Sequence, residues 1–162
     1  METNKSSKKI FDPILFGSGP ECFITGIILV LIVRYMEFIF DIPKIHISDS
    51  LSNTIFIIAI ILTLAVMIWG FASLPIQKRG KELITDKAFK YFRHPIYAGF
   101  IDFFFFGLGF YLKSIGLLIL GVILIFMWGK IVEKEENYLI SQFGQKYKDY
   151  QKRTKKFIPL IY

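Results

Sequence analysis

The feature that most constrains this chain is a set of apolar runs long enough to cross a lipid bilayer. A helix needs about 20 mostly apolar residues to span the hydrocarbon core, and the run over residues 51–72 meets this without a charged side chain. Three further runs are similar, with few charges among them. The sequence therefore predicts an all-α, polytopic membrane protein. Its four transmembrane helices are expected at 21–40, 51–72, 96–112 and 115–132.

The composition agrees with a membrane protein. Hydrophobic residues make up 54% of the 162-residue chain, with 18 Phe, which exceeds what the core of a soluble domain of this size requires. No cleavable signal peptide is apparent, because the first apolar run follows a polar segment and lacks a small-residue cleavage pattern. We expect the first run to be retained as a span of one membrane domain over residues 1–162.

The basic residues predict how the helices are oriented. Four spans place the N-terminal tail, the loop after residue 72 and the region from Lys130 on one side, and these hold 17 of the 20 Lys and Arg residues. Cytoplasmic segments carry such an excess. We therefore expect both termini in the cytoplasm, at a bacterial-type inner membrane. Orientation and anionic headgroups account for the net charge of +7, so we expect no nucleic-acid partner.

The third and fourth runs are separated only by a turn at Lys113 and Ser114, which predicts an antiparallel helical hairpin. The fourth run continues without a helix breaker to Phe143, a length of roughly 43 Å at 1.5 Å per residue. Its end should therefore project into the cytoplasm and stop at Gly144, before a basic C-terminal helix. The expected cytoplasmic face comprises residues 73–95 and 133–162.

The segment Arg93–Tyr97 joins a basic stretch to the third span. Pro95 suits the first turn of a helix, which places His94 at its start. The Tyr97 hydroxyl, three residues along, can then face the same cavity between the helices as His94. Each residue also has a structural interpretation: Arg93 as a headgroup anchor, His94 as a helix cap and Tyr97 as an interfacial aromatic.

A second polar group lies on the extension of the fourth helix. The hairpin brings Glu135 and Glu136 beside the third span, where a carboxylate could meet a cationic ligand near His94. The alternative is a solvated helix end, on which Lys130 and Lys134 balance the acids.

Charged residues within spans are costly and are candidates for function. Asp102 lies seven residues beyond Pro95, roughly 10 Å into the membrane at helical rise. It should either face a polar cavity, where it would bind a ligand, or form a hydrogen bond between helices. Arg34 and Glu37 are three residues apart and are expected to pair with each other.

Other kinds of site are not indicated. The two histidines, His46 and His94, are predicted on opposite sides of the membrane, so we expect no metal site. The single cysteine, Cys22, cannot form an internal disulfide.

Two motifs in order carry a family resemblance. The chain reads "LITDKAFKYFRHPIYAG", then the hairpin, then "KIVEKEENYLISQFGQKYKDYQKRTKKFIP". Together these resemble the isoprenylcysteine carboxyl methyltransferase and phospholipid methyltransferase superfamily, whose members are small integral-membrane enzymes that use S-adenosylmethionine. The resemblance covers about half of the chain, from Leu83 to Pro159.

The resemblance implies an enzyme that moves a methyl group from S-adenosylmethionine to a lipid or lipid-like acceptor, of the isoprenylcysteine carboxylate or phospholipid amine type. It implies a cofactor site, with Glu135 holding the charged part of the cofactor and a loop over Gly107–Phe110 flanking it. The predicted cofactor-binding residues are His94, Pro95, Tyr97, Asp102, Glu135 and Glu136. No catalytic residue is predicted.

The chain departs from the family pattern at two points. Lys87 and Ala88 stand where the family has Gly-Pro, and Ile131 stands where it has an arginine associated with the substrate. Lys130 or Lys134 could supply the missing charge. The predicted substrate-contacting residues are therefore Arg93, Lys130 and Lys134.

Two other functions stay open at this stage. One is a membrane reductase of the sterol-reductase type, although such enzymes are generally much longer and bind a dinucleotide. The other is a non-enzymatic membrane protein on the same fold. The sequence predicts neither the acceptor's identity nor an oligomeric state.

Overall fold

A computed structural model describes residues 17–78 and 81–158 of the chain. Within these ranges the chain is helical, and its β structure is one isolated bridge between Phe92 and Lys155. The all-α prediction is confirmed for this part. The expected N-terminal tail and Pro159, the last motif position, lie outside the described residues.

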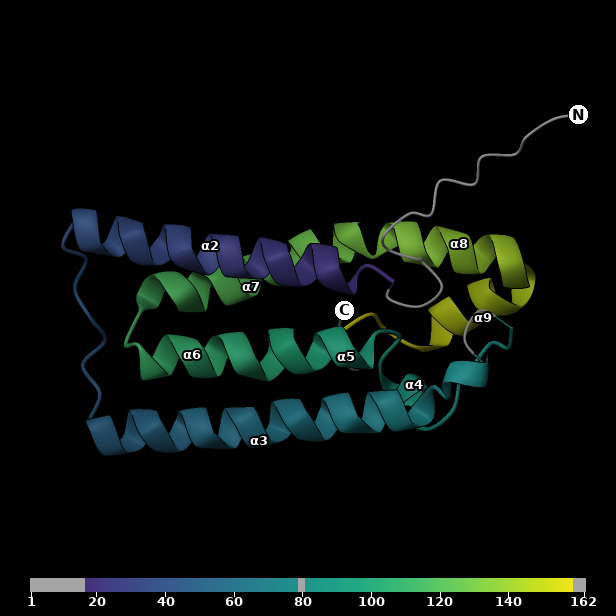
Figure 1. Cartoon of the computed structure of the whole chain (residues 1–162), viewed down its shortest axis with the longest axis horizontal. Helices are drawn as coiled ribbons and strands as arrows, with labels where there is room; N and C mark the ends of the chain where they lie inside the picture. The colour runs from purple at the N-terminus through teal and green to yellow at the C-terminus, as the bar shows by residue number, and fades with distance from the viewer. Residues whose placement is uncertain (1–16, 79–80, 159–162) are drawn as a thin grey trace, which may run out of the picture.

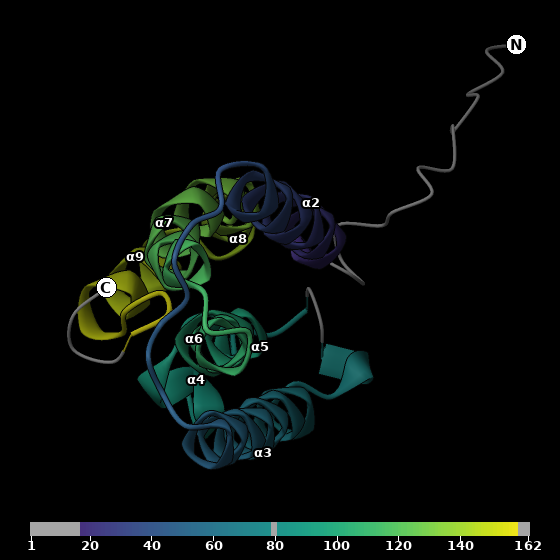
Figure 2. The same cartoon turned by 90° about the vertical axis from the view of Figure 1, so that its left-hand side faces the viewer.

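The helices pack lengthwise into a bundle (Figures 1 and 2). The long elements are α2 (Gly19–Ile39), α3 (Asp49–Ser73), α7 (Ile115–Ile131) and α8 (Glu133–Phe143). The third helix consists of α5 (Pro95–Ala98), the π-helical segment η2 (Gly99–Phe104) and α6 (Phe105–Tyr111). The short elements are the 3₁₀ helix η1 (Ile76–Lys78), α4 (Ala88–Tyr91) and α9 (Gln145–Arg153). Seen end-on, the third helix lies between α3 and α7, and α2 flanks α7.

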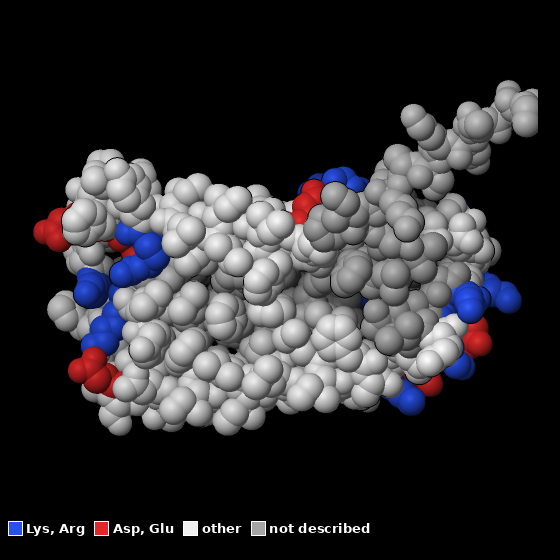
Figure 3. Space-filling view, in the orientation of Figure 1, with Lys and Arg blue, Asp and Glu red and all other residues white. Residues whose placement is uncertain are grey.

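Three of the four predicted spans have the length and composition to cross a membrane. They are the helices Gly19–Ile39, Asp49–Ser73 and Ile115–Phe143. The predicted third span is a shorter apolar helix, Pro95–Tyr111, about 26 Å long against a hydrocarbon core of about 30 Å. On the face shown, charged side chains gather at the two ends of the bundle, with a further group on the upper edge near the middle, and a broad uncharged region lies between the left end and that group (Figure 3).

The third helix begins where the sequence predicts. Pro95 occupies its first turn and His94 is its N-cap residue. The π-helical stretch packs on α3, where the Thr63 hydroxyl donates to the carbonyl of Gly99 at 3.1 Å. The predicted loop over Gly107–Phe110 is wrong, because these residues form part of α6. A Cβ at Gly107 would lie 2.3 Å from the Cβ of Ala59 on α3, so this glycine allows the two helices to pack closely.

The predicted hairpin of the third and fourth helices is confirmed. Lys113 adopts a φ of +53° in the turn, and the Ser114 hydroxyl caps α7 by accepting from the Leu117 N–H at 2.9 Å. The core between the two helices is apolar. Its fully buried side chains include Ile101 from the third helix and Leu124 and Trp128 from α7.

The C-terminal region returns to the start of the third helix. Helix α8 ends at Gly144, which has a φ of +55°, and α9 follows it. Beyond α9 the backbone pairs with the chain before Pro95: the Arg93 N–H donates to the Lys155 carbonyl at 2.8 Å and the His94 N–H to the Lys156 carbonyl at 3.1 Å. The two sequence motifs therefore meet at one end of the bundle.

Candidate functional site

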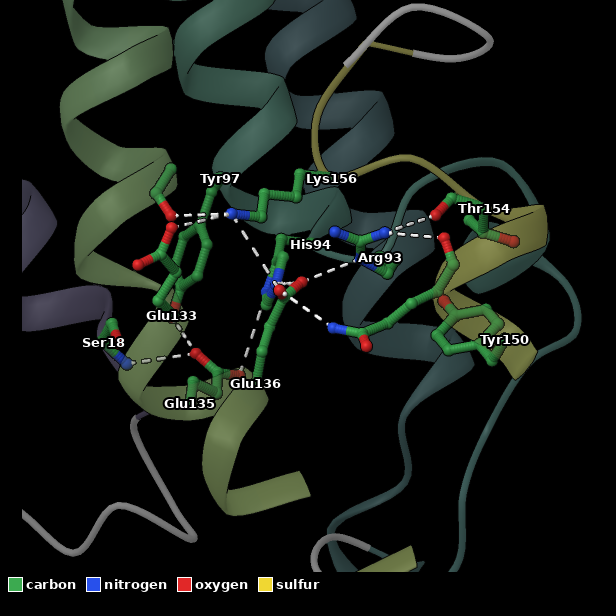
Figure 4. A network of polar contacts seen from close by, with 12 residues as sticks. Ser18, Arg93, His94, Tyr97, Glu133, Glu135, Glu136, Tyr150, Thr154 and Lys156 are labelled. Atoms are coloured by element: carbon green, nitrogen blue, oxygen red, sulfur yellow. Dashed lines mark hydrogen bonds and ion pairs between the residues drawn. The ribbon is translucent and has the colours of Figure 1, made fainter. Parts of the chain in front are cut away.

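A group of polar side chains gathers where α8, α9, the start of α2 and the start of the third helix converge (Figure 4). We call it the polar cluster. It comprises Ser18, Arg93, His94, Tyr97, Glu135, Glu136 and Lys156. Of the residues predicted from sequence, the cluster brings together Arg93, His94, Tyr97 and both glutamates.

Glu136 is the buried centre of the cluster, with a relative exposure of 5%. Its Oε1 accepts from Arg93 Nε at 2.8 Å and lies 3.1 Å from His94 Nε2, and its Oε2 accepts from Gln151 Nε2 at 3.1 Å. A buried carboxylate is tolerated when it is paired and hydrogen-bonded in this way. Glu136 therefore holds the cluster together.

Arg93 is committed to internal contacts. Besides Glu136, its Nη1 donates to the carbonyls of Gln151 at 3.0 Å and Thr154 at 2.7 Å. Its side chain is only 9% exposed. This arrangement ties α9 and the returning chain to the start of the third helix. The substrate contact of Arg93 stays a prediction.

Two more hydrogen bonds fix α9 against α4. The Tyr150 hydroxyl donates to the Phe89 carbonyl at 2.6 Å, and the Thr154 hydroxyl donates to the Lys90 carbonyl at 3.3 Å. Burial raises the pKa of the Tyr150 hydroxyl, so this group stays protonated and remains a donor at neutral pH. These bonds hold α4, which precedes His94 in the chain, against α9.

Glu135 is arranged differently from its neighbour. Its Oε2 accepts from the Tyr97 hydroxyl at 3.2 Å and from the Ser18 N–H at 3.3 Å. Its Oε1 lies 4.0 Å from His94 Nδ1. No Lys or Arg between residues 17 and 158, masked positions aside, forms an ion pair with it. Of the two carboxylates in the polar cluster, Glu135 is therefore the one without a Lys or Arg partner among the described residues.

The inner cation of the cluster is Lys156, which sequence reasoning did not identify. Its Nζ donates to the Gly129 carbonyl at 2.9 Å and lies 3.7 Å from Glu133 and 4.0 Å from Glu136. The side chain is 14% exposed. Lys156 enters the cluster because the C-terminal backbone pairs with residues 92–94, a contact that the sequence does not indicate.

The two lysines proposed from sequence lie outside the cluster. The side chain of Lys130 is 81% exposed and pairs with Glu133 at 3.2 Å. The side chain of Lys134 is 74% exposed and pairs with Glu21 at 3.0 Å. Helix periodicity explains the difference, because the buried positions Trp128, Val132 and Glu136 follow one another at four-residue spacing on the opposite face.

Aromatic rings surround the ring of His94. The Tyr97 ring stacks on it with centroids 5.6 Å apart, and Phe157 lies 6.0 Å away on the returning chain. Tyr97 in turn meets Trp128 edge-on. Pro95 is buried against α3, where a Cβ at Gly70 would touch its ring. Histidine and tyrosine thus present a partly apolar wall next to the Glu135 carboxylate.

Asp102 lies apart from the cluster, on the π-helical segment. Its Oδ1 is buried and has no hydrogen-bond partner among the described residues. The helix-to-helix hydrogen bond that the sequence allows is not observed there. No described contact joins Asp102 to His94, Tyr97 or Glu135.

The charged pair predicted within the first helix is confirmed. Arg34 Nη1 and Glu37 Oε2 are 2.6 Å apart. Glu37 also accepts from the Ser114 hydroxyl and from the Gly116 N–H at the start of α7. The pair lies near the end of α2 and contacts the start of α7, whereas Ser18 and Glu135 of the polar cluster lie at the start of α2 and on α8, which follows α7. Over residues 17–78 and 81–158, no group of three or more His, Cys, Asp or Glu could hold a metal ion.

Comparison with known proteins gives one informative similarity. No protein-family model matches the chain. The protein-S-isoprenylcysteine O-methyltransferase of Schizosaccharomyces pombe is 34% identical to it over 97 residues, which are 57% of this chain and 40% of that protein. The chain therefore matches less than half the length of this relative. The similarity confirms the resemblance to the isoprenylcysteine carboxyl methyltransferase superfamily that the two motifs indicate.

Proposed function

We propose that this chain is an integral-membrane methyltransferase that uses S-adenosylmethionine and acts on a prenylated or otherwise lipid-like acceptor. The observation that carries the proposal is the Glu135 carboxylate, which has no Lys or Arg partner among the described residues. The 34% identical relative supports the reaction class. Helices of spanning length support a membrane location.

A cationic ligand suits the charges around Glu135. In the polar cluster, the cations Arg93 and Lys156 are engaged with Glu136 and its surroundings. The charge of Glu135 is left to attract a positive group, with an effect that grows as water is excluded. S-adenosylmethionine carries such groups in its sulfonium and its α-ammonium. We assign Glu135 to that cationic part, with His94 and Tyr97 beside it.

The protein's contribution to methyl transfer is then orientation and a suitable environment. The bound cofactor supplies a methyl group on a positively charged sulfur, and that charge disperses as the acceptor takes the methyl group. The fixed network around Glu136 keeps His94 and Tyr97 in place, which favours an in-line approach of the reactants. The aromatic wall limits water near the reacting charge. Glu135 would bind the neutral thioether less strongly than the sulfonium, which favours product release.

The acceptor is proposed to be prenylated, because the relative's name specifies isoprenylcysteine. Such an acceptor partitions into lipid and would approach the cluster from the bilayer. We place the polar-cluster end in the cytoplasm on the basis of the Lys and Arg excess in residues 73–95 and 133–162. No observation favours the reductase alternative.

The proposal is tested by methyl transfer from radiolabelled S-adenosylmethionine in proteoliposomes of the full chain. We expect label in a farnesylated cysteine with a free carboxylate, and little label in phosphatidylethanolamine. His94→Ala should lower the rate by roughly tenfold or more, because the group next to Glu135 is lost. Label in phosphatidylethanolamine alone would show that the acceptor is a phospholipid amine and not a prenylated carboxylate, while the proposed methyl transfer would stand. Absence of both transfer and cofactor binding would contradict the proposal.

A further inference from the structure

The turn that precedes α2 contacts Glu135 on the neighbouring helix α8. The Ser18 N–H donates to Glu135 Oε2 at 3.3 Å, a contact between residues 117 positions apart in the chain. This turn lies outside both sequence motifs of the family resemblance. Its neighbour Gly19 faces the Tyr97 ring, which a Cβ there would meet at 3.6 Å.

Gly17 lies directly against the side chain of Glu135. It has a φ of +55°, a conformation that other residues rarely adopt. A Cβ at this position would lie 2.8 Å from Glu135 Oε2 and 3.0 Å from its Cδ. A larger residue would be strained by this φ, and its Cβ would displace the Glu135 carboxylate from the observed position.

Ser18 is fixed to the helix that carries Glu135. It is the N-cap residue of α2, yet its side chain makes no capping hydrogen bond. The hydroxyl instead donates to the Ile131 carbonyl at 3.4 Å, at the end of α7. Ser18 is 7% exposed. The turn is thus anchored four residues from Glu135 and is held in register with it.

These contacts give the two oxygens of the Glu135 carboxylate different hydrogen-bonding environments. Oε2 takes both hydrogen bonds, from the Ser18 N–H and the Tyr97 hydroxyl. Oε1 faces the ring of His94 at 4.0 Å and accepts no hydrogen bond from the described residues. A carboxylate oxygen has room for two donors. Oε1 is therefore the oxygen that can receive a ligand.

We propose that Gly17 and Ser18 are positioning residues of the cofactor site: they fix Glu135 Oε2 so that Oε1 is presented to the cationic part of S-adenosylmethionine. The inference rests on the proposed function. It makes the N-terminal end of α2 a functional part of the site. The partial positive charge of that helix end also stabilises the carboxylate.

The first arm of the test measures affinity for S-adenosylmethionine with the full chain in detergent. Gly17→Ala should weaken binding about tenfold, because it displaces the carboxylate. Gly144→Ala is the matched control: Gly144 has the same φ of +55°, but nothing lies within 4 Å of its Cβ position. It should lose stability to backbone strain and keep its affinity. Equal affinities for the two variants would overturn the inference.

A second pair of variants separates the two contacts of Ser18. Ser18→Pro removes the N–H that reaches Glu135, whereas Ser18→Ala keeps it and removes only the hydroxyl. We expect the proline variant to bind S-adenosylmethionine about tenfold more weakly than the alanine variant, since a hydrogen bond to a charged group is lost. Equal affinities would contradict a role for the N–H.

The last arm needs no cofactor and tests the contact itself. Gly17→Ala should lower the Tm by roughly 2–4 °C more in the native chain than in a Glu135→Ala background, where the clash is absent. Gly144→Ala should lower the Tm by the same amount in the native chain and in the Glu135→Ala background. Lack of coupling would overturn the inference even if the native chain binds the cofactor. Coupling in a chain that fails to bind S-adenosylmethionine would instead refute the proposed function, and with it the positioning role.

Discussion

Helix α2 packs on the continuous helix formed by α7 and α8, and at each end a glutamate on one helix accepts a backbone hydrogen bond from the start of the other. The two glutamates differ in how their charge is balanced. At one end, Glu37 on α2 accepts from the Gly116 N–H at the start of α7. At the other, Glu135 on α8 accepts from the Ser18 N–H at the start of α2. In each case a glycine Cβ would lie 2.8 Å from the carboxylate oxygen. The difference is that Glu37 also pairs with Arg34.

This contrast distinguishes a structural carboxylate from a binding one. Glu37 has a cation, a hydroxyl and a backbone donor, so its charge is matched within the protein. Glu135 has one backbone donor, one hydroxyl and a histidine at 4.0 Å. We infer that the first joins helices, whereas the second joins helices and also retains charge for a ligand.

The largest effect on stability should come from the ion pair of Arg93 and Glu136 in the polar cluster. Arg93→Met leaves Glu136 buried without its closest cation, which should cost about 3–5 kcal/mol of stability. The variant should melt well below the native chain in detergent, and α9 should exchange amide hydrogens faster. Arg153→Met, at an exposed site on α9, is the control. Equal melting temperatures of the two variants would show that Arg93 does not hold α9 against the start of the third helix.

A smaller effect is expected at the opposite end. Glu37→Gln removes the charge that pairs with Arg34 while keeping an acceptor for the donors at the start of α7. We expect a loss of about 1–3 kcal/mol in the free energy of unfolding, with unchanged affinity for S-adenosylmethionine. A fall in affinity would mean that the two ends do not differ as proposed.

The smallest effects should separate the inner lysine from the outer one. Lys156→Met removes a cation held by the Gly129 carbonyl and two glutamates, and should cost roughly 1 kcal/mol of stability. Lys130→Met removes an exposed pair, so its change should stay within about 0.5 kcal/mol. Thermal unfolding measures both. The same loss in each would contradict the placement of Lys156 as the inner cation.

Sequence reasoning succeeded where the determining physics is local. Apolar length identifies three helices of spanning length and a shorter fourth one. Pro95 fixes the start of the third helix, and the two-residue turn at Ser114 requires an antiparallel hairpin. The spacing of Arg34 and Glu37 sufficed to predict their pair.

The rest depends on contacts between distant parts of the chain. Lys156 enters the cluster because the C-terminal backbone pairs with residues 92–94, and nothing in its own neighbourhood indicates this. The contact of Ser18 with Glu135 depends on how α2 packs on α7. Lys130 and Lys134 are close to Ile131 in sequence, but the four-residue periodicity of buried positions through Val132 places both lysines on the exposed face of the helix. The π-helical stretch around Asp102 has no sequence signal that we recognise.

The central claim is that Glu135 holds the positive charge of the cofactor, and one binding measurement tests it most directly. The affinity of the full chain for S-adenosylmethionine is compared with those of Glu135→Gln and Glu133→Gln. Both changes remove one negative charge from α8, but Glu133 is already paired with Lys130 and Lys156. We predict binding about 10–100-fold weaker for Glu135→Gln and within about twofold of the native chain for Glu133→Gln. Equal affinities for the two variants would contradict the claim.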